Sequence, residues 1–191
     1  MEKKVIIVGA GLVGSLWAVY MAKAGYKVTI YERRSDIRKA EISAGKSINL
    51  ALSSRGWKAL ENAGVDSDVR KIAIPMNGRI MHDLDGKLTY QSYGKEDEAI
   101  YSVSRGHLNA IMMDIAENKG KADIHYHQKW LDADLENGKI TLKNLLTNKV
   151  IEDSADLVFA ADGAFSAVRY NAMQKLDRFN YSQFFIEDGY K

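Results

Sequence analysis

Two short runs of consecutive apolar residues begin the chain, and each predicts a buried β-strand. The first extends from Lys3 to Val8 and stops at glycines, and the second extends from Lys27 to Tyr31. Apolar side chains recur between the runs near helical spacing, at Leu12, Leu16, Val19, Tyr20 and Ala24. Gly25 stands where a helix commonly ends in a left-handed residue. Because two strands joined by such a helix are parallel with a right-handed crossover, we predict an α/β fold built on a Rossmann-like, doubly wound parallel sheet.

Later segments alternate between helical and strand patterns. Ser53 to Ala63 predicts a helix closed by Gly64, and Arg79 to Tyr93 alternates like a hairpin around an Asp85-Gly86 turn. A second amphipathic helix is predicted at Leu108, Ile111, Met112, Ile115 and Ala116. Further strands are predicted over Ile124 to Trp130, Lys139 to Leu145 and Leu157 to Ala161. Phe179 to Lys191 has the pattern of a strand that begins, so we expect a longer parent chain of which this is the N-terminal part.

Composition narrows the classes of partner. The 27 basic and 25 acidic residues are mixed along the chain, without the basic surplus typical of nucleic-acid binding. No cysteine is present, which excludes disulfides and thiolate sites. The first apolar run is too short for a signal peptide or membrane span, so we expect a cytoplasmic protein without a membrane partner. His125 and His127 alternate on a predicted strand and would share a face, but no third ligand accompanies them, so no metal site is predicted.

A glycine-rich turn, Gly9-Ala10-Gly11-Leu12-Val13-Gly14, stands directly between the first predicted strand and helix. This spacing is the dinucleotide-binding fingerprint. Its first glycine permits the tight turn, its second lets the backbone approach a pyrophosphate, and its third lets helix and strand pack closely. We expect the phosphates to lie on free N–H groups at the positive end of the helix dipole. The cofactor-binding residues predicted here are Gly9, Gly11, Val13 and Gly14.

Glu32 ends the second predicted strand, about twenty residues after the turn. A carboxylate at this place accepts hydrogen bonds from the hydroxyls of an adenosine ribose and repels a 2′-phosphate. Arg33 and Arg34 follow and are also predicted to contact the cofactor, since arginine there could hold the 2′-phosphate of NADP. By themselves these features also fit an NAD-dependent dehydrogenase of ordinary Rossmann type. We favour FAD because Glu32 holds the nearer position and because of two further motifs.

The first further motif is an Asp162-Gly163 turn that follows a buried strand, with a serine and an arginine at the next helix start. The run from Asp156 to Arg169 resembles the Asp-Gly motif of the flavoprotein aromatic hydroxylases. Arg105, which follows Tyr101 to Ser104 and precedes a predicted helix, matches an arginine that in this family reaches over the FAD pyrophosphate and ribityl chain. The resemblance therefore implies that Arg105, Asp162 and Gly163 belong to the flavin site.

The second further motif is Gly45 to Trp57, which resembles a run typical of the kynurenine 3-monooxygenase branch of that family. The resemblance continues in the same order at Ile74 to Met76, Arg79, His82, Tyr93-Gly94, Tyr181 to Gln183 and Gly189-Tyr190. It covers essentially all of this chain, but only the amino-terminal part of a typical family member. Flavin contacts by Ala51 and Trp130 are also implied.

The resemblance implies an FAD-dependent, NADPH-using monooxygenase that hydroxylates L-kynurenine at position 3 with O2, through a flavin hydroperoxide. Arg79 matches the arginine that grips the substrate carboxylate, for which a guanidinium fork is suited, and Tyr93 would add a hydroxyl donor. No catalytic base is expected, because the amino group on the substrate ring supplies the electron density. Residues 1–74 and 100–175 would form the FAD-binding domain. Residues 75–99 and 176–191 would be strands that start a β-rich substrate domain.

Some parts of the family pattern are absent. The sequence has neither the second flavin motif, Gly-Asp with a following proline, nor the asparagine and tyrosine that complete the substrate pocket. We therefore expect the chain alone to retain FAD weakly or not at all and to be inactive. A non-catalytic FAD-binding fragment stays open as an alternative, and so does a homodimer as the assembly.

Overall fold

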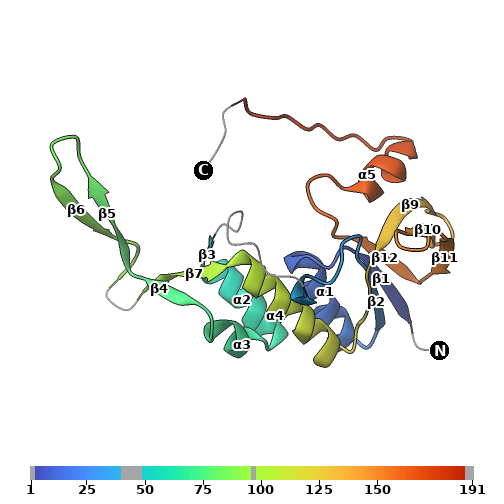
Figure 1. Ribbon diagram of the computed structural model, residues 1–191, viewed down its shortest axis with the longest axis horizontal. Helices are drawn as coiled ribbons and strands as arrows, with labels where there is room; N and C mark the ends of the chain where they lie inside the picture. Colours follow the sequence, from blue (N-terminus) through green and yellow to red (C-terminus); the bar gives the residue numbers. More distant parts are fainter. Residues whose placement is uncertain (1–2, 40–48, 96–97, 188–191) are drawn as a thin grey trace.

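The computed structural model describes residues 3–39, 49–95 and 98–187. Its centre is a four-stranded parallel sheet in the order β12-β1-β2-β8 (Figure 1). The strands are β1 (Lys4–Val8), β2 (Lys27–Tyr31), β8 (Asp123–His125) and β12 (Leu157–Ala160). β1 pairs in parallel with both β2 and β12, which confirms the predicted α/β fold and its first βαβ unit.

Helices cover one face of this sheet. α1 (Leu12–Lys23) connects β1 to β2 and packs against α4 (Arg105–Asn118). The helices bury Ala18, Met113 and Ala116 against Val5 and Ile7 of β1. α2 (Ser54–Ala63) and α3 (Asp66–Arg70) extend this layer, with Gly64 closing α2 in the left-handed conformation as predicted. The short helix η1 (Ile37–Lys39) follows β2.

A three-stranded antiparallel sheet covers the opposite face, where a doubly wound fold has helices. Its strands are β9 (Gln128–Asp134), β10 (Lys139–Asn144) and β11 (Val150–Ser154), in the order β11-β10-β9. Side chains of β9, β10 and the short helix α5 (Ala167–Asn171) form one buried cluster with Ile6 and Val8. Successive residues of β1 therefore face two different layers, one helical and one built from strands.

The prediction of a single strand over Ile124 to Trp130 is wrong. The structure divides this segment into β8 and β9, which belong to different sheets. The break lies at His127, whose φ of +59° is incompatible with a continuous strand. The His127 amide donates to the Arg34 carbonyl, and the Gln128 amide donates to the Glu32 carbonyl. The chain thus crosses the end of β2 between the two sheets, and His125 and His127 do not share one strand face.

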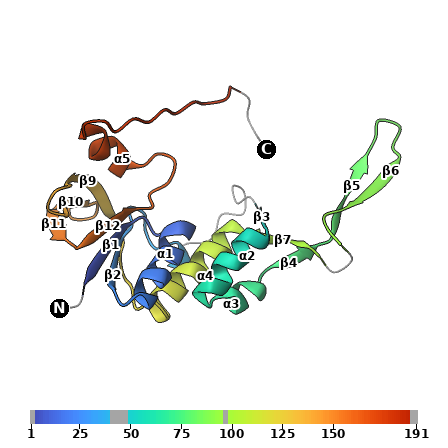
Figure 2. The ribbon, with the colours of Figure 1, turned by 180° about the vertical axis from the view of Figure 1, so that it is seen from behind.

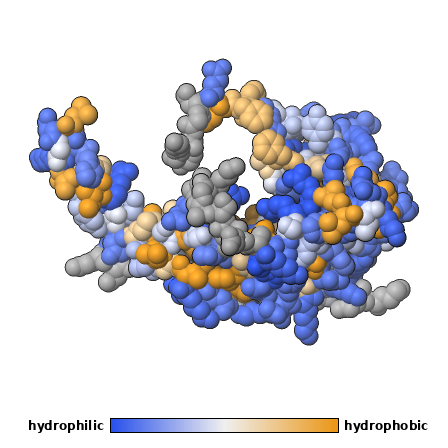
Figure 3. Space-filling model, viewed as in Figure 1, coloured by the Kyte–Doolittle hydropathy of each residue, from blue (hydrophilic) through white to orange (hydrophobic). Residues whose placement is uncertain are grey.

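A small sheet and a hairpin form the other end of the molecule (Figure 2). β7 (Ile100–Ser104) pairs antiparallel with β3 (Asn49–Leu52) and with β4 (Ile74–Met76). The chain then leaves this sheet as the predicted hairpin of β5 (Gly78–His82) and β6 (Leu88–Ser92), with Gly86 in the turn at φ +79°. The hairpin stands clear of the other elements and carries apolar surface (Figure 3). Its exposed apolar side chains include Ile80, Met81, Leu84, Leu88 and Tyr90.

The segment after α5 contains the short helix η2 (Met173–Lys175) and then runs on without a strand as far as residue 187. The strand predicted from Phe179 is therefore wrong for residues 179–187, and residues 188–191 lie outside the described part. A strand forms only where its backbone groups find a neighbouring strand, and this segment pairs with no sheet in the described structure. Phe184, Phe185 and Ile186 remain exposed along it. Among the described helices, none has the length and apolar character needed to cross a membrane.

Candidate functional site

The glycine turn lies between the end of β1 and the start of α1, and packing requires glycine at two of its positions. Gly9 has a φ of +102°, a conformation that favours glycine. A Cβ on Gly14 would lie 1.9 Å from the Gly9 carbonyl oxygen, and a Cβ on Gly9 would lie 2.7 Å from the Ala161 carbonyl oxygen. The turn, the helix and the end of β12 therefore meet backbone against backbone.

Gly11 differs from these two, because a Cβ there would meet nothing within 4 Å. Gly11 is the N-cap of α1, and the amides of Leu12, Val13 and Gly14 in the first turn have no intrahelical partner. No other backbone group in the described part of the chain accepts from them. Unpaired N–H groups beside open space at a helix start suit a diphosphate group, and a side chain at Gly11 would fill that space.

Glu32 follows directly after β2 and is only 5% exposed. Its Oε2 accepts a hydrogen bond from the Ala10 amide at 2.8 Å, so the carboxylate lies beside the glycine turn. Burial raises the pKa of Glu32, but hydrogen bonds from the Arg34 side chain and backbone and from the Ala10 amide outweigh it and hold the pKa below its ordinary value. The end of β2 therefore places an ionised carboxylate beside the glycine turn.

The two arginines after Glu32 are placed differently. Arg34 forms an ion pair with Glu32, with its Nε 2.9 Å from Oε1. Arg33 is exposed and makes no hydrogen bond to Glu32 in the described part of the chain. Of the two arginines that were predicted to contact the cofactor, only Arg34 therefore lies against the Glu32 carboxylate.

Asp162 and Gly163 lie next to the glycine turn. A Cβ on Gly9 would be 3.1 Å from the Asp162 Cα, which places the two sequence motifs in contact. Asp162 Oδ2 accepts from the Val168 amide at 3.2 Å, whereas Oδ1 is buried and has no partner among the described residues. Gly163 has a φ of +86° and turns the chain at this point. A buried carboxylate oxygen without a donor fits a site that a ligand hydroxyl completes.

Arg105 and Ala51 lie at the small sheet. Arg105 is exposed at the first turn of α4, directly after Ser104, which caps the helix by accepting from the His107 amide. Ala51 is exposed on β3 and pairs with Ser102 of β7. The first part of the Gly45 to Trp57 run, residues 45–48, lies outside the described residues. Both side chains are open to solvent, and their predicted flavin contacts stay predictions.

The Trp130 side chain lies in the core of the protein. Its side chain is 3% exposed and packs with Ile140, Leu142 and Val168 between the two sheets. Sequence reasoning grouped it with the cofactor residues, whereas the structure gives its indole a place in the core. A role for Trp130 toward the cofactor stays a prediction.

Arg79 and Tyr93 lie on the projecting hairpin. Arg79 pairs with Gln91 across the two strands, and its Nε donates to Gln91 Oε1 at 2.8 Å. Tyr93 follows β6, is 44% exposed, and donates its amide to the Asn77 carbonyl. Both residues therefore belong to one hairpin, which lies away from the glycine turn in this chain (Figure 1).

A network of hydrogen bonds around Arg38, which sequence reasoning did not identify, supports the segment after Glu32. Arg38 donates to Asp36 through Nε at 2.8 Å and through Nη2 at 2.9 Å, and it also donates to Tyr126. Further bonds reach Asp114 and Glu117 on α4. Hydrogen bonds from Arg38 hold the pKa of the buried Asp36 below its ordinary value. This network fixes the segment after Glu32 against α4. The sequence signal for it was the spacing of Asp36 and Arg38, which allows a turn closed by an aspartate.

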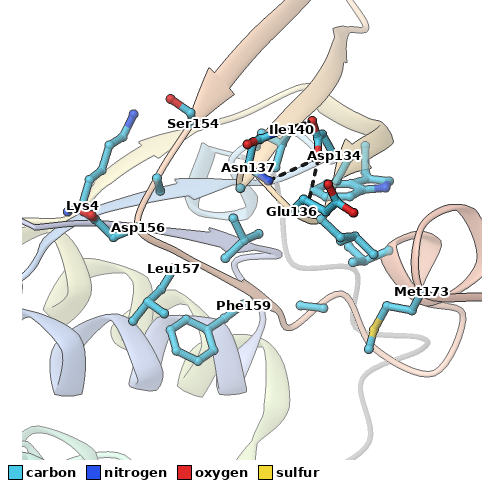
Figure 4. A pocket seen from close by; sticks show the side chains of 18 of the residues that line it. Lys4, Asp134, Glu136, Asn137, Ile140, Ser154, Asp156, Leu157, Phe159 and Met173 are labelled. Atoms are coloured by element: carbon cyan, nitrogen blue, oxygen red, sulfur yellow. Dashed lines mark hydrogen bonds between the residues drawn. The ribbon is translucent and has the colours of Figure 1, made fainter. Parts of the chain in front are cut away.

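A cavity of about 990 Å³ lies elsewhere, beside the free edge of β12 (Figure 4). The lining comes from β12 with Leu157 and Phe159, from the end of β9 with Asp134, from the β9–β10 turn with Asn137, and from η2 with Met173. Of the predicted site residues only Trp130 lines it. No residue of the glycine turn lines this cavity, and we do not assign the dinucleotide to it.

Comparison with known sequences supports the reading of the motifs. A sequence model of the family described as FAD binding domain matches residues 2–184. The chain is 48% identical over 190 residues to the kynurenine 3-monooxygenase of Christiangramia forsetii, and this match covers 100% of this chain and 42% of that protein. It is 50% identical over 188 residues to the enzyme of that name from Flavobacterium johnsoniae, and that match covers 98% of this chain and 41% of the relative. The counterpart from Sus scrofa is 42% identical over 187 residues, with 97% and 39% covered. The resemblance to this group is confirmed, and the chain spans about two fifths of the length of these relatives.

Two solved structures with a similar fold are oxygenases by name. The p-nitrophenol 4-monooxygenase of Pseudomonas putida DLL-E4 matches with a TM-score of 0.72 at 23% identity, over 88% of this chain and 43% of that one. A 2-methyl-3-hydroxypyridine-5-carboxylic acid oxygenase matches with a TM-score of 0.68 at 24% identity, over 88% and 42%. At this identity the likeness concerns the fold alone, and it confirms the predicted fold class.

Proposed function

The chain belongs to the FAD binding domain family, and from that premise we propose that it forms the FAD-binding part of an aromatic hydroxylase that acts on kynurenine. The observation that carries the proposal is the buried, ionised Glu32 hydrogen-bonded to the glycine turn, in a chain that resembles kynurenine 3-monooxygenases along its whole length. The Glu32 carboxylate suits the two hydroxyls of an unphosphorylated ribose, and the free amides of the first turn of α1 suit a pyrophosphate.

Each half of FAD has residues that fit it. The amides after Gly11 would hold the pyrophosphate, and Glu32 would hold the adenosine ribose. The unpartnered Asp162 Oδ1 would accept a hydroxyl on the flavin side, next to the turn. Arg105 would reach over the pyrophosphate from the start of α4. The binding free energy would come mostly from backbone N–H groups and charge-assisted hydrogen bonds.

Bound FAD would supply the redox chemistry, with NADPH as the proposed electron donor and O2 as the oxygen source. This chain's contribution to the substrate would be Arg79, whose guanidinium suits an amino-acid carboxylate, with the Tyr93 hydroxyl as a second donor. The amino group on the kynurenine ring provides the electron density for attack, so no protein base is needed. The protein then acts by positioning the ring and excluding water.

Calorimetric titration of the 191-residue chain with FAD, ADP and NAD tests the cofactor assignment. We expect FAD and ADP to bind, with FAD held weakly because parts of the family pattern are absent from the chain. Gly11→Ala should abolish binding, since its Cβ would enter the space beside the free amides, while thermal unfolding stays unchanged because that Cβ contacts no protein atom. Binding of NAD alone would contradict the proposal and favour a dehydrogenase.

The activity is tested separately by following NADPH oxidation when kynurenine is added. We expect no turnover from this chain alone, and turnover from a full-length relative of the same family. Loss of turnover in the relative when the arginine equivalent to Arg79 is replaced by methionine, with FAD still bound, would support the substrate role. Unchanged kinetics in that variant would remove Arg79 from the substrate site.

A further inference from the structure

The carboxylate of Glu32 has no free acceptor position. Oε1 accepts from the Arg34 amide at 2.8 Å and from Arg34 Nε at 2.9 Å. Oε2 accepts from the Ala10 amide at 2.8 Å and from Arg34 Nη2 at 3.4 Å. A carboxylate offers about four lone-pair positions. The group that we assign to the nucleotide ribose is therefore already saturated by the protein.

These four bonds are of two kinds. The two backbone amides belong to the rigid turn and to the chain that follows β2, and they fix the carboxylate in place. The two guanidinium bonds come from a side chain that is 57% exposed, whereas the Glu32 side chain is 7% exposed. The guanidinium therefore lies on the solvent side of the carboxylate, where a ligand would approach. Its two N–H groups use carboxylate acceptor positions that two ribose hydroxyls would need.

We propose that Arg34 is an internal stand-in for the ribose, which the incoming nucleotide must displace from Glu32 before it binds. This inference rests on the proposed function, because it concerns the same adenosine site. Arg34 adds to the two backbone amides that pair the carboxylate when no nucleotide is present, since buried polar groups are hydrogen-bonded. The same contact makes Arg34 a residue that lowers nucleotide affinity.

The size of the effect follows from the exposure of the pair. Ribose hydroxyls would replace two charge-assisted hydrogen bonds, but the released guanidinium regains water. An ion pair open to solvent on one side contributes little. We therefore expect removal of the guanidinium to tighten nucleotide binding by about threefold to tenfold, which corresponds to roughly 0.6–1.4 kcal/mol.

The test measures the affinity of the 191-residue chain for ADP, which carries the ribose and pyrophosphate without the flavin. Arg34→Met keeps the aliphatic stem and removes the guanidinium. Lys27→Met is the matched control, because it removes one positive charge from an exposed side chain of β2 that makes no hydrogen bond to Glu32. ADP should bind Arg34→Met more tightly than the natural sequence, and Lys27→Met should show no gain.

A second probe separates displacement from a structural role of Arg34. 2′-Deoxy-ADP offers one hydroxyl fewer to Glu32, so its gain from Arg34→Met should be smaller than the gain for ADP. A general change in the fold would alter both ligands equally. ADP binding by Arg34→Met alone, with none by the natural sequence, would be the extreme form of the expected result.

Two outcomes overturn the inference in different ways. If the natural sequence binds ADP and Arg34→Met binds it equally or more weakly, Arg34 is not a competitor, and the proposed function is untouched. If neither protein binds ADP or FAD, the nucleotide site itself is wrong and both proposals fail together.

Discussion

The parallel-sheet region and the projecting hairpin contain similar residues in different surroundings. Ile6 and Ile7 of β1 are each 0% exposed. Ile6 faces the β9–β10–β11 layer, and Ile7 faces the helical layer. Ile80 of β5 is 60% exposed, and Leu84 in the hairpin turn is fully exposed. The pairing of backbone groups is regular in both regions. The difference teaches that a strand forms where its backbone pairs with a neighbour, whereas burial of its side chains requires a second layer.

The segment after η2 also exposes apolar side chains. Phe184 and Ile186 are 90% and 84% exposed. Apolar surface of this kind marks a contact site, and a two-stranded hairpin alone is marginally stable in water. The division that places residues 75–99 and 176–191 in a second unit stays a prediction. We expect these apolar surfaces to be contact surfaces.

The largest effect is expected in the glycine turn of the parallel-sheet region. Gly14→Ala places a Cβ 1.9 Å from the Gly9 carbonyl oxygen, which only a backbone shift could relieve. We expect a loss of about 4 kcal/mol or more in the free energy of unfolding. Urea unfolding followed by circular dichroism measures it. Gly11→Ala adds the same methyl group in open space and should cost less than about 0.5 kcal/mol. Equal costs for both variants would show that the turn is not packed as described.

The next effect compares isoleucines directly. Ile7→Ala removes a fully buried side chain and should destabilise the fold by about 3 kcal/mol, because it leaves a cavity between β1 and the helices. Ile80→Ala is the matched change on the hairpin and should alter the free energy of unfolding by less than about 0.5 kcal/mol. The same urea titration measures both. A large cost at Ile80 would mean that the hairpin is covered in solution.

The smallest effect concerns Asp36. Because Arg38 holds the pKa of Asp36 below its ordinary value, the ionised form stabilises the fold. That contribution is fully present above the ordinary carboxyl pKa of about 4, and it is lost as the pH falls through the lower pKa of the folded state. Asp36→Asn should cost about 2 kcal/mol at neutral pH and should weaken the fall in stability on acidification.

Asp85→Asn in the hairpin turn is the control for Asp36. The Asp85 side chain makes no hydrogen bond in the described part of the chain. Unfolding free energies at neutral and acidic pH should be nearly unchanged by this substitution. If Asp36→Asn behaves like Asp85→Asn, the Arg38 network does not stabilise the segment after Glu32.

Much of the site was visible in the sequence because dinucleotide binding places strict local demands on the backbone. Gly9 needs a left-handed conformation and Gly14 a close approach, and each demand selects glycine at a fixed spacing. Glu32 was visible because a strand end fixes its distance from the turn. The contact between the Asp162 turn and Gly9 was not visible, since these residues lie more than a hundred positions apart and only the pairing of β1 with β12 brings them together.

The sequence by itself determined the elements around the glycine turn and the hairpin, because local periodicity and turn residues specify them. It could not show that Ile124 to Trp130 divides between two sheets, because that break serves the crossing at the end of β2. It could not place Trp130 in the core, since that contact depends on which layers pack together, and it could not fix the direction of the Arg34 side chain, which is free to point away from Glu32. Only the tertiary structure decided them, because burial and ion pairing arise between segments that the chain order leaves far apart or leaves free to point elsewhere.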